Sequence, residues 1–232
     1  MRAAWLLLVP VAAGCVGDID PPWQLDHERI VAVRATPPHI PSGATSTLDA
    51  LLAHKGAPTE VVPPTTAFVS PLAPVALQGS VVAAGAGWTV VAPGEDALAT
   101  ARIDLMLDPG APVPLLVGLT FGSGADALVA TKFVYLGDAA DNPTLGTILV
   151  AGAPPPAAIV VPPDVDVPLS IDAPDTFDVN WLTSCGTMHD DNEPSAFVHV
   201  LPADPMTGEL AVVVRDTSAG VAFQTWPIST GN

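Results

Sequence analysis

Proline is spread so densely along this chain that long helices are excluded. The 232 residues include 27 prolines and 19 glycines. A proline ring removes a helical hydrogen-bond donor and clashes with the preceding turn, whereas short strands joined by turns accept it at their edges and ends. Because 49% of the residues are hydrophobic and only 13% are charged, the chain is also too apolar to remain disordered. These properties predict a folded, all-β protein.

The ionisable residues are strongly unbalanced. Asp and Glu number 24 against 7 Lys and Arg, which gives a formal net charge of −17. The only lysines are Lys55 and Lys132. Binding of nucleic acid depends on basic groups that neutralise phosphates. We therefore expect no nucleic-acid partner and no attraction to anionic lipid headgroups, and solubility explains the acidity.

The first 14 residues have the layout of a secretory signal peptide. Arg2 supplies a short positive region, residues 5–11 (WLLLVPV) form an apolar stretch too short to span a bilayer, and small residues occupy positions 12–14. We therefore expect residues 1–14 to be removed on export.

Residues 12–15 (AAGC) resemble the lipobox of bacterial lipoproteins, although Ala12 stands where that family usually has Leu. The resemblance implies that Cys15 becomes the first residue and carries lipid, palmitate being among the expected acyl chains. Two or more acyl chains anchor a protein stably. Val16 follows the cysteine, whereas an Asp there retains enteric lipoproteins in the inner membrane, so an outer-membrane location is favoured. The alternative is a secreted protein without lipid.

Cys185 is the only other cysteine. If Cys15 is acylated, Cys185 has no partner within the chain, and the fold must rely on hydrophobic burial. His189 lies four residues further on, with acids beyond it, but no nearby cation or helix terminus would lower the pKa of the thiol. We expect a buried, inert thiol, with a metal, redox or catalytic role as the alternatives.

Alternation of apolar and polar residues predicts short strands from residue 29 onward. Such stretches are 29–35, 46–52, 101–107, 113–121, 128–135, 145–151, 165–171, 177–181, 197–201, 210–215 and 220–226, whereas 63–92 is apolar but irregular. The polar segment 137–143 (GDAADNP) separates two sets of strands. The predicted organisation is a signal peptide (1–14), a tether (15–28), a first β-sandwich (29–137) and a second, immunoglobulin-like β-sandwich (143–232). We expect antiparallel pairing and almost no helix.

Two parts of the chain resemble known families. Residues 165–226, with FDVNW, SCGTM and ELAVVVRDTSAGVAFQTW, resemble the polycystic-kidney-type and related immunoglobulin-like domains of bacterial surface proteins. The opening RIVAVRATPPHIPSGATSTLDALL is similar to the first domain of predicted lipoproteins from myxobacteria and their relatives. The resemblance implies a fold and a location but no activity.

No complete motif for catalysis or cofactor binding occurs in the sequence. Gly122-Ser123-Gly124 is a hairpin turn rather than a nucleophile elbow, and the chain has no H-E-x-x-H, C-x-x-C or phosphate-binding loop. We therefore expect no catalytic residue, no cofactor and no metal ligand. Two acidic clusters, 138–142 and 189–193, carry oxygen ligands of the kind that Ca²⁺ prefers, but solvated turns explain them more simply.

The resulting hypothesis is a lipid-anchored envelope protein, not an enzyme, whose β-sandwich domains provide binding or structural contacts. Its expected partners are the membrane, through lipid on Cys15, and another envelope protein or a polysaccharide. The alternative is an accessory lipoprotein that binds polysaccharide through Trp88 or Trp226, although Trp181 and Trp226 lie in alternating strands and are expected in the core. A hydrolase would need a pocket that joins Cys185, His189 and an acid.

Overall fold

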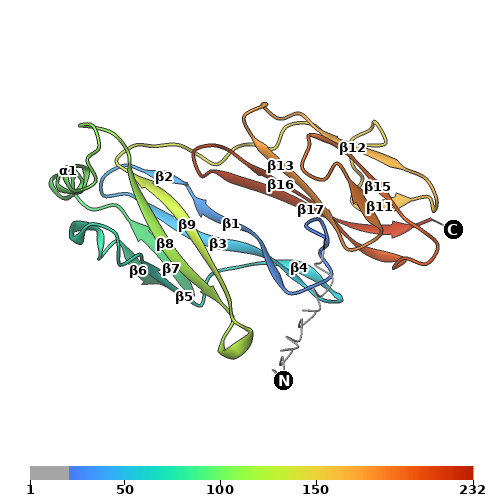
Figure 1. Cartoon of the computed structure of the whole chain (residues 1–232), viewed down its shortest axis with the longest axis horizontal. Coiled ribbons are helices and arrows are strands. Elements are labelled where there is room, and N and C mark those ends of the chain that lie inside the picture. Colours follow the sequence, from blue (N-terminus) through green and yellow to red (C-terminus); the bar gives the residue numbers. More distant parts are fainter. Residues whose placement is uncertain (1–20, 232) are drawn as a thin grey trace, which may run out of the picture.

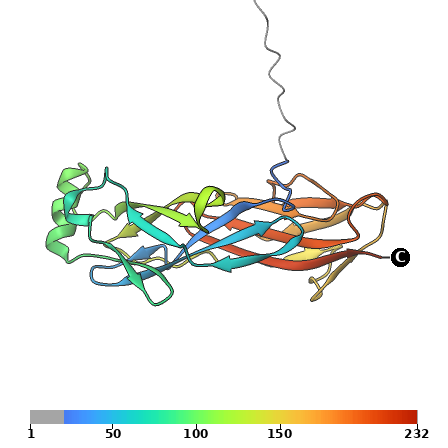
Figure 2. The ribbon, with the colours of Figure 1, turned by 90° about the horizontal axis from the view of Figure 1, so that it is seen from below.

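The computed structural model describes residues 21–231 and shows two β-sandwich domains arranged end to end in one elongated body (Figure 1, Figure 2). The predicted signal peptide and Cys15 lie outside the described residues. Within residues 21–231, no helix is both long and apolar enough to cross a membrane.

The first domain packs two sheets against each other. One sheet has the order β1 (Arg29–Thr36), β3 (Thr45–His54), β7 (Gly87–Val91) and β6 (Val81–Ala84), and β4 (Ala57–Val62) pairs with the second half of β3. The other sheet has the order β2 (His39–Ile40), β9 (Leu128–Leu136), β8 (Val113–Phe121) and β5 (Thr66–Val69). Two short 3-10 helices, η1 (Val75–Leu77) and η2 (Gly124–Asp126), lie in the loops. Buried aliphatic side chains from both sheets fill the space between them.

The second domain repeats this arrangement. One sheet has the order β10 (Ile148–Val150), β12 (Val167–Ile171), β15 (Ser195–His199) and β14 (Thr187–His189). The other has the order β11 (Ile159–Val161), β17 (Val221–Thr230), β16 (Thr207–Arg215) and β13 (Asp178–Thr183). Trp181 and Trp226 lie in its core at 0% and 4% exposure, as their strand positions predict.

In both domains the opening strand is divided between the two sheets. β1 joins one sheet and β2 the other, and β10 and β11 do the same in the second domain. Prolines separate the two strands in each case, at 37–38 between β1 and β2 and at 154–156 between β10 and β11. A proline has no N–H group to donate to a β-ladder, so the strand ends there and the chain crosses to the opposite sheet. The all-β, immunoglobulin-like class is confirmed. The expectation of purely antiparallel pairing is wrong at two places, since β2 pairs parallel with β9 and β11 parallel with β17.

The strand predicted at 101–107 is wrong. The chain forms helix α1 (Glu95–Asp104) there, at the far end of the first domain. Leu98 and Ala101 face the core with helical spacing, and Glu95 and Asp96 stabilise the first turn through the helix dipole. The alternation of Ala101, Ile103 and Leu105 is therefore coincidental, and Ile103 is 76% exposed.

Candidate functional site: the junction between the domains

A third hydrophobic core joins the two domains. We call it the junction core; it consists of Leu25, Val31, Ala32, Leu51, Ala53, Leu182, Ala211, Val213 and Val221, with Phe223 at its edge. The side chains come from β1 and β3 of the first domain and from β13, β16 and β17 of the second. Successive strand residues point to opposite faces, so Leu51 enters the junction core while its neighbour Leu52 enters the core of the first domain. The two sandwiches therefore share a buried, apolar wall.

The N-terminal segment is docked into this junction. Leu25 is 2% exposed, and its amide donates to the Thr183 carbonyl at 3.0 Å, while the Thr183 amide donates to the Trp23 carbonyl at 2.9 Å. Arg29 donates from Nη1 to the carbonyls of Pro22 and Gln24. The part of the predicted tether from Pro21 onward thus lies against the second domain, and the chain leaves the body on that side of the junction, over the second domain (Figure 2).

Hydrogen bonds reinforce the junction around its apolar centre. Asn142 donates from Nδ2 to the Ala35 carbonyl and accepts at Oδ1 from the Val221 amide, both at 2.8 Å. Its single side chain therefore bonds both domains. His39 lies between two acceptors, the Asp138 carboxylate at 2.9 Å from Nδ1 and the Ser218 carbonyl at 2.9 Å from Nε2.

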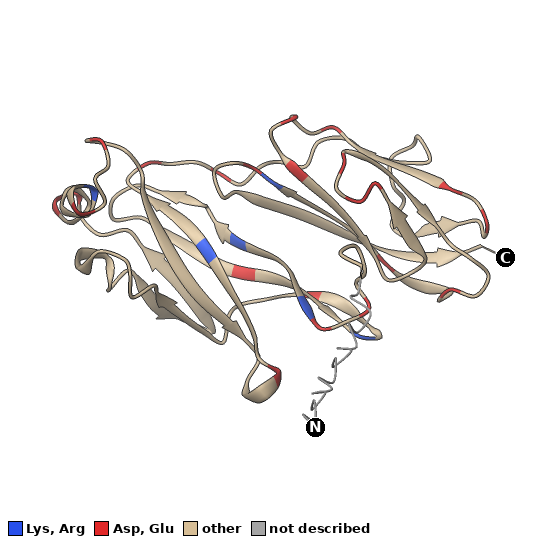
Figure 3. Cartoon of the chain, viewed as in Figure 1, with Lys and Arg blue, Asp and Glu red and all other residues tan. Residues whose placement is uncertain are grey.

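Positive charge is concentrated where the two acidic domains meet. Four of the 7 basic residues lie there, on β1, β9 and β16 (Figure 3): Arg29, Arg34, Lys132 and Arg215. Arg215 donates to the Val31 carbonyl at 2.9 Å, and Lys132 donates to the Ala219 carbonyl. Burial lowers the pKa of both Arg29 and Arg215. Burial, with a smaller contribution from Arg215, lowers the pKa of Lys132 to about 8. These bonds join cations of one domain to backbone of the other.

Arg34 makes a separate contact across the junction. It pairs with Asp49 through two hydrogen bonds of 3.1 and 3.0 Å within the first domain. Its guanidinium carbon also lies 4.4 Å from the ring centroid of Phe223 in the second domain, a cation–π contact.

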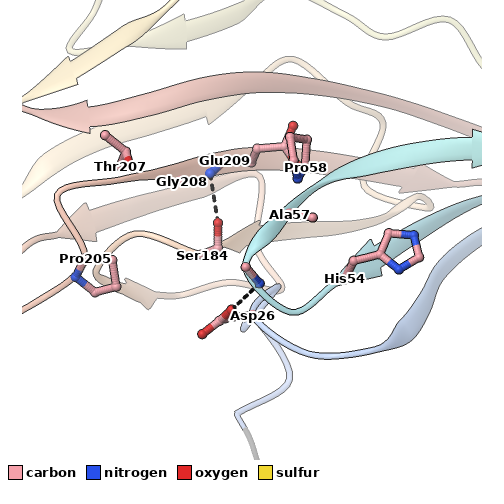
Figure 4. Close-up of a pocket in the computed structure, with 10 residues that line it drawn as sticks. Asp26, His54, Ala57, Pro58, Ser184, Pro205, Thr207, Gly208 and Glu209 are labelled. Carbon is pink, nitrogen blue, oxygen red and sulfur yellow. Dashed lines mark hydrogen bonds between the residues drawn. The ribbon is translucent and has the colours of Figure 1, made fainter.

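A groove of about 490 Å³ opens beside the junction, between the β3–β4 hairpin and the loops of the second domain (Figure 4). Its polar groups are engaged with one another. Asp26 accepts from the Gly56 amide at 3.0 Å, and Glu209 accepts from the Thr59 amide at 2.5 Å. The groove therefore connects the N-terminal segment, the hairpin and the second domain.

His54 lies at the rim of this groove between two acids. Its Nδ1 is 2.8 Å from Glu28 and its Nε2 is 3.2 Å from Glu60. Hydrogen bonding to Glu28 raises the pKa of His54, and the same bond lowers the pKa of Glu28. Because Glu28 directly precedes β1 in the N-terminal segment, the contact with the His54 imidazole links that segment to the hairpin.

The surroundings of Cys185 do not favour a catalytic role together with His189. The thiol is fully buried in the second core and donates to the Pro205 carbonyl at 3.0 Å. Burial raises its pKa, which is the opposite of what a cysteine nucleophile needs. His189 stacks on the Phe197 ring with centroids 4.7 Å apart.

The two acidic clusters have structural roles. Asp138 pairs with His39, and Asn142 bonds to backbone. In the 189–193 loop, the carbonyls of Asp191 and Glu193 accept from the backbone amide and the indole of Trp181. Within residues 21–231, no group of three or more His, Cys, Asp or Glu side chains is placed to hold a metal ion.

The alternative of a tryptophan surface that binds polysaccharide concerned Trp88 and Trp226. Trp226 is 4% exposed, and Trp88 is half-buried against the first core with its indole donating to the Thr65 carbonyl at 3.2 Å. The buried ring of Trp226 is therefore closed to a sugar ligand, whereas Trp88 is only partly covered.

Comparison with known proteins assigns the chain to no family. No family model matches it, and no curated protein matches its sequence. Similar solved structures include a chimeric titin Z1Z2 tandem (12% identity, 88% of this chain and 100% of that chain, TM-score 0.31) and the tandem Ig repeats of Dlar (9%, 88% and 98%, 0.30).

Another similar structure is a SusE-like, surface-located polysaccharide-binding protein from the Bacteroides thetaiotaomicron heparin utilisation locus (12% identity, 88% of this chain, TM-score 0.29). The matched region spans 34% of that chain. All three TM-scores are below 0.5, so the strand order described above, and not these likenesses, defines the fold.

Proposed function

We propose that this protein is a lipid-anchored, non-catalytic component of a bacterial cell envelope, in which two β-sandwich domains act as one rigid unit for binding or structural contacts. The junction core is the observation that carries this proposal. Leu25 packs into it together with side chains from both domains, so the anchoring segment and the two sandwiches converge at one place. A force on either domain, whether applied directly or through a bound ligand, is then transmitted to the anchoring segment without a flexible hinge.

The sequence before residue 21 supports the anchoring part of the proposal. An apolar stretch is followed by AAGC, and a cysteine in that position is the acceptor for diacylglycerol in bacterial lipoproteins. The rigid pair supports the binding or structural part, since two domains joined by one core present their outer surfaces in a fixed arrangement.

Detergent partition with two matched cysteine variants tests the anchor. We expect the full-length chain, expressed with its own leader in a bacterium with two membranes, to enter the detergent phase and to carry the mass of an acylated Cys15. Cys15→Ala should leave the protein in the aqueous phase or as an uncut precursor, whereas Cys185→Ala should partition like the wild type. A Cys15→Ala protein that stays with the membrane overturns the proposal.

A further inference from the structure

We propose that the outer face of the β2–β9–β8–β5 sheet is a membrane-contacting surface, and that the bilayer holding Cys15 is its occupant. This rests on the proposed function, because the lipid on Cys15 supplies the bilayer. We call this surface the sheet face; it consists of Thr66, Phe68, Leu116, Thr120, Val129, Thr131, Phe133 and Tyr135.

The sheet face exposes large apolar side chains. Phe68 is 55%, Val129 74% and Phe133 45% exposed. Phe133 lies opposite Leu116 on the neighbouring strand, and its ring centroid is 6.4 Å from that of Tyr135. Exposed apolar residues scattered singly need no explanation, but a contiguous group on one sheet marks an interaction surface.

Gly118 makes the sheet face flat. It lies opposite Phe68, and a Cβ atom added at Gly118 would come within 2.3 Å of the Phe68 ring. The ring therefore lies over the backbone of β8 instead of standing away from the sheet. A flat apolar surface suits a broad partner better than a narrow ligand, which favours a concave pocket.

The sheet face carries no acid, although the chain has 24. Strands β5, β8 and β9 contain one charged residue, Lys132, which is 8% exposed and points to the other side of the sheet, where it bonds Ala219. The exposed Ile103 and Met106 of the α1 region differ, because Asp104 and Asp108 flank them. Ionised carboxylates are costly to bring against hydrocarbon, so the sheet face is suited to approach a bilayer.

The position of the N-terminal segment brings the bilayer to this side. The blue N-terminal segment leaves the body over the second domain, on the same broad side as the green strands β8 and β9 of the first domain (Figure 2). From Cys15 to Pro21 the chain spans six peptide units, which reach at most about 20 Å. Because Leu25 is fixed in the junction core, no slack is added beyond Pro21. A lipid on Cys15 therefore holds this flank of the body close to the membrane.

The chemistry of the contact follows from the residues. Phenylalanine and tyrosine rings are well suited to the boundary between headgroups and acyl chains. The sheet face offers no exposed basic residue to attract anionic headgroups, and the net charge of −17 opposes them. The contact should therefore be strongest on zwitterionic bilayers.

Two single-cysteine probes on lipid vesicles test the inference. The full-length, acylated chain is reconstituted in phosphatidylcholine liposomes, where buried Cys185 stays unreactive and an introduced cysteine takes an environment-sensitive fluorophore. Thr66→Cys places the probe on the sheet face, and Thr45→Cys places it at another exposed position, on the opposite sheet. We expect brominated lipids to quench the Thr66 probe several-fold more than the Thr45 probe. Phe133→Ser with Val129→Ser should remove that difference, and phosphatidylglycerol should reduce it.

The outcomes separate this inference from the anchor. Equal quenching at both positions in protein that floats with the liposomes overturns the sheet-face inference and leaves the anchor intact. A Thr66 probe that is shielded from water but not quenched by lipid also overturns it, and identifies a second copy or a soluble partner as the occupant. Failure to float overturns the anchor itself.

Discussion

Lys132, on β9 of the first domain, has a buried ammonium group that donates a hydrogen bond to the carbonyl of Ala219 in the second domain. Burial lowers the pKa of Lys132 from 10.5 to about 8. Between these values the unfolded chain holds a proton that the folded chain lacks, so the free energy of unfolding rises with pH across this window. Below pH 8 the buried charge lowers stability.

Lys132→Met should therefore raise the stability at pH 7. We expect a gain of about 1–3 kcal/mol, since the relieved charge outweighs the lost hydrogen bond. Urea unfolding at pH 7 and pH 10 measures it, and the advantage over the wild type should shrink at pH 10. Lys55→Met, at an exposed hairpin position, serves as the control. An unchanged pH slope in Lys132→Met would contradict the assignment.

Substitutions at Leu51 and Leu52 distinguish the coupling between the two domains from the stability of the first domain. Leu51→Ala and Leu52→Ala should each lower the free energy of unfolding by about 2–5 kcal/mol, because each leaves a cavity in a packed core. Only Leu51→Ala opens the junction core. Calorimetry should show one transition for the wild type and for Leu52→Ala, and two for Leu51→Ala. Two transitions in the wild type would mean that the domains are uncoupled.

Asn142 should control cleavage of the segment between the domains. Asn142→Ala leaves the Val221 amide and the Ala35 carbonyl without their partner, at a cost of about 1–3 kcal/mol. Limited proteolysis should then cut within 137–143, which the wild type resists. Asn192→Ala, in an exposed loop, should not change the pattern. Rapid cutting of the wild type at 137–143 would show that the side chain does not hold this segment.

His54 should titrate above its ordinary pKa of 6.5. Its bond to Glu28 favours the protonated ring, so the stabilisation of the N-terminal segment is fully present below pH 6.5 and is lost as the pH rises through the folded value. NMR titration of the imidazole should show the raised midpoint, and Glu28→Gln should lower it. Glu95→Gln, on α1, should leave it unchanged. A midpoint insensitive to Glu28→Gln would exclude this bond in solution.

Cys185 should react slowly with a thiol reagent at neutral pH in the folded protein and rapidly after denaturation. Burial both blocks access and raises the pKa of the thiol. Cys185→Ser should fold with a loss of about 1–3 kcal/mol. Fast stoichiometric labelling of the native protein, slowed by His189→Ala, would instead indicate a reactive site.

Strands that are buried on one face could be predicted from the sequence. For strands that are buried on both faces, the sequence did not reveal that the second face packs against the other domain. Alternation identified β8 and most of β12, because one face of each packs inward. The apolar run of β16, LAVVV, has no alternation and reads only as a strand. Its signal was present nonetheless, because continuous apolar runs indicate strands covered on both sides. Which element covers the second face depends on tertiary packing and is not encoded locally.

Helix α1 and the polar contacts were beyond sequence pattern for different reasons. The apolar residues of 95–107 fit periods of two and of about four, and the stronger helical preference of its Ala, Glu and Arg residues prevails. The pairing of Asn142 with Ala35 and Val221 joins positions far apart in the chain, so no local signal specifies it.

The neighbouring positions of Leu51 and Leu52 also limit how the two domains can be exchanged by recombination during evolution. Because one strand supplies side chains to two cores, neither sandwich is a complete globule, and a gene fragment that encodes either half alone would yield a protein with an apolar wall open to water. Recombination that exchanges single domains would produce aggregating products. The pair, together with the segment that holds Leu25, is therefore the smallest piece of this protein that evolution can move intact.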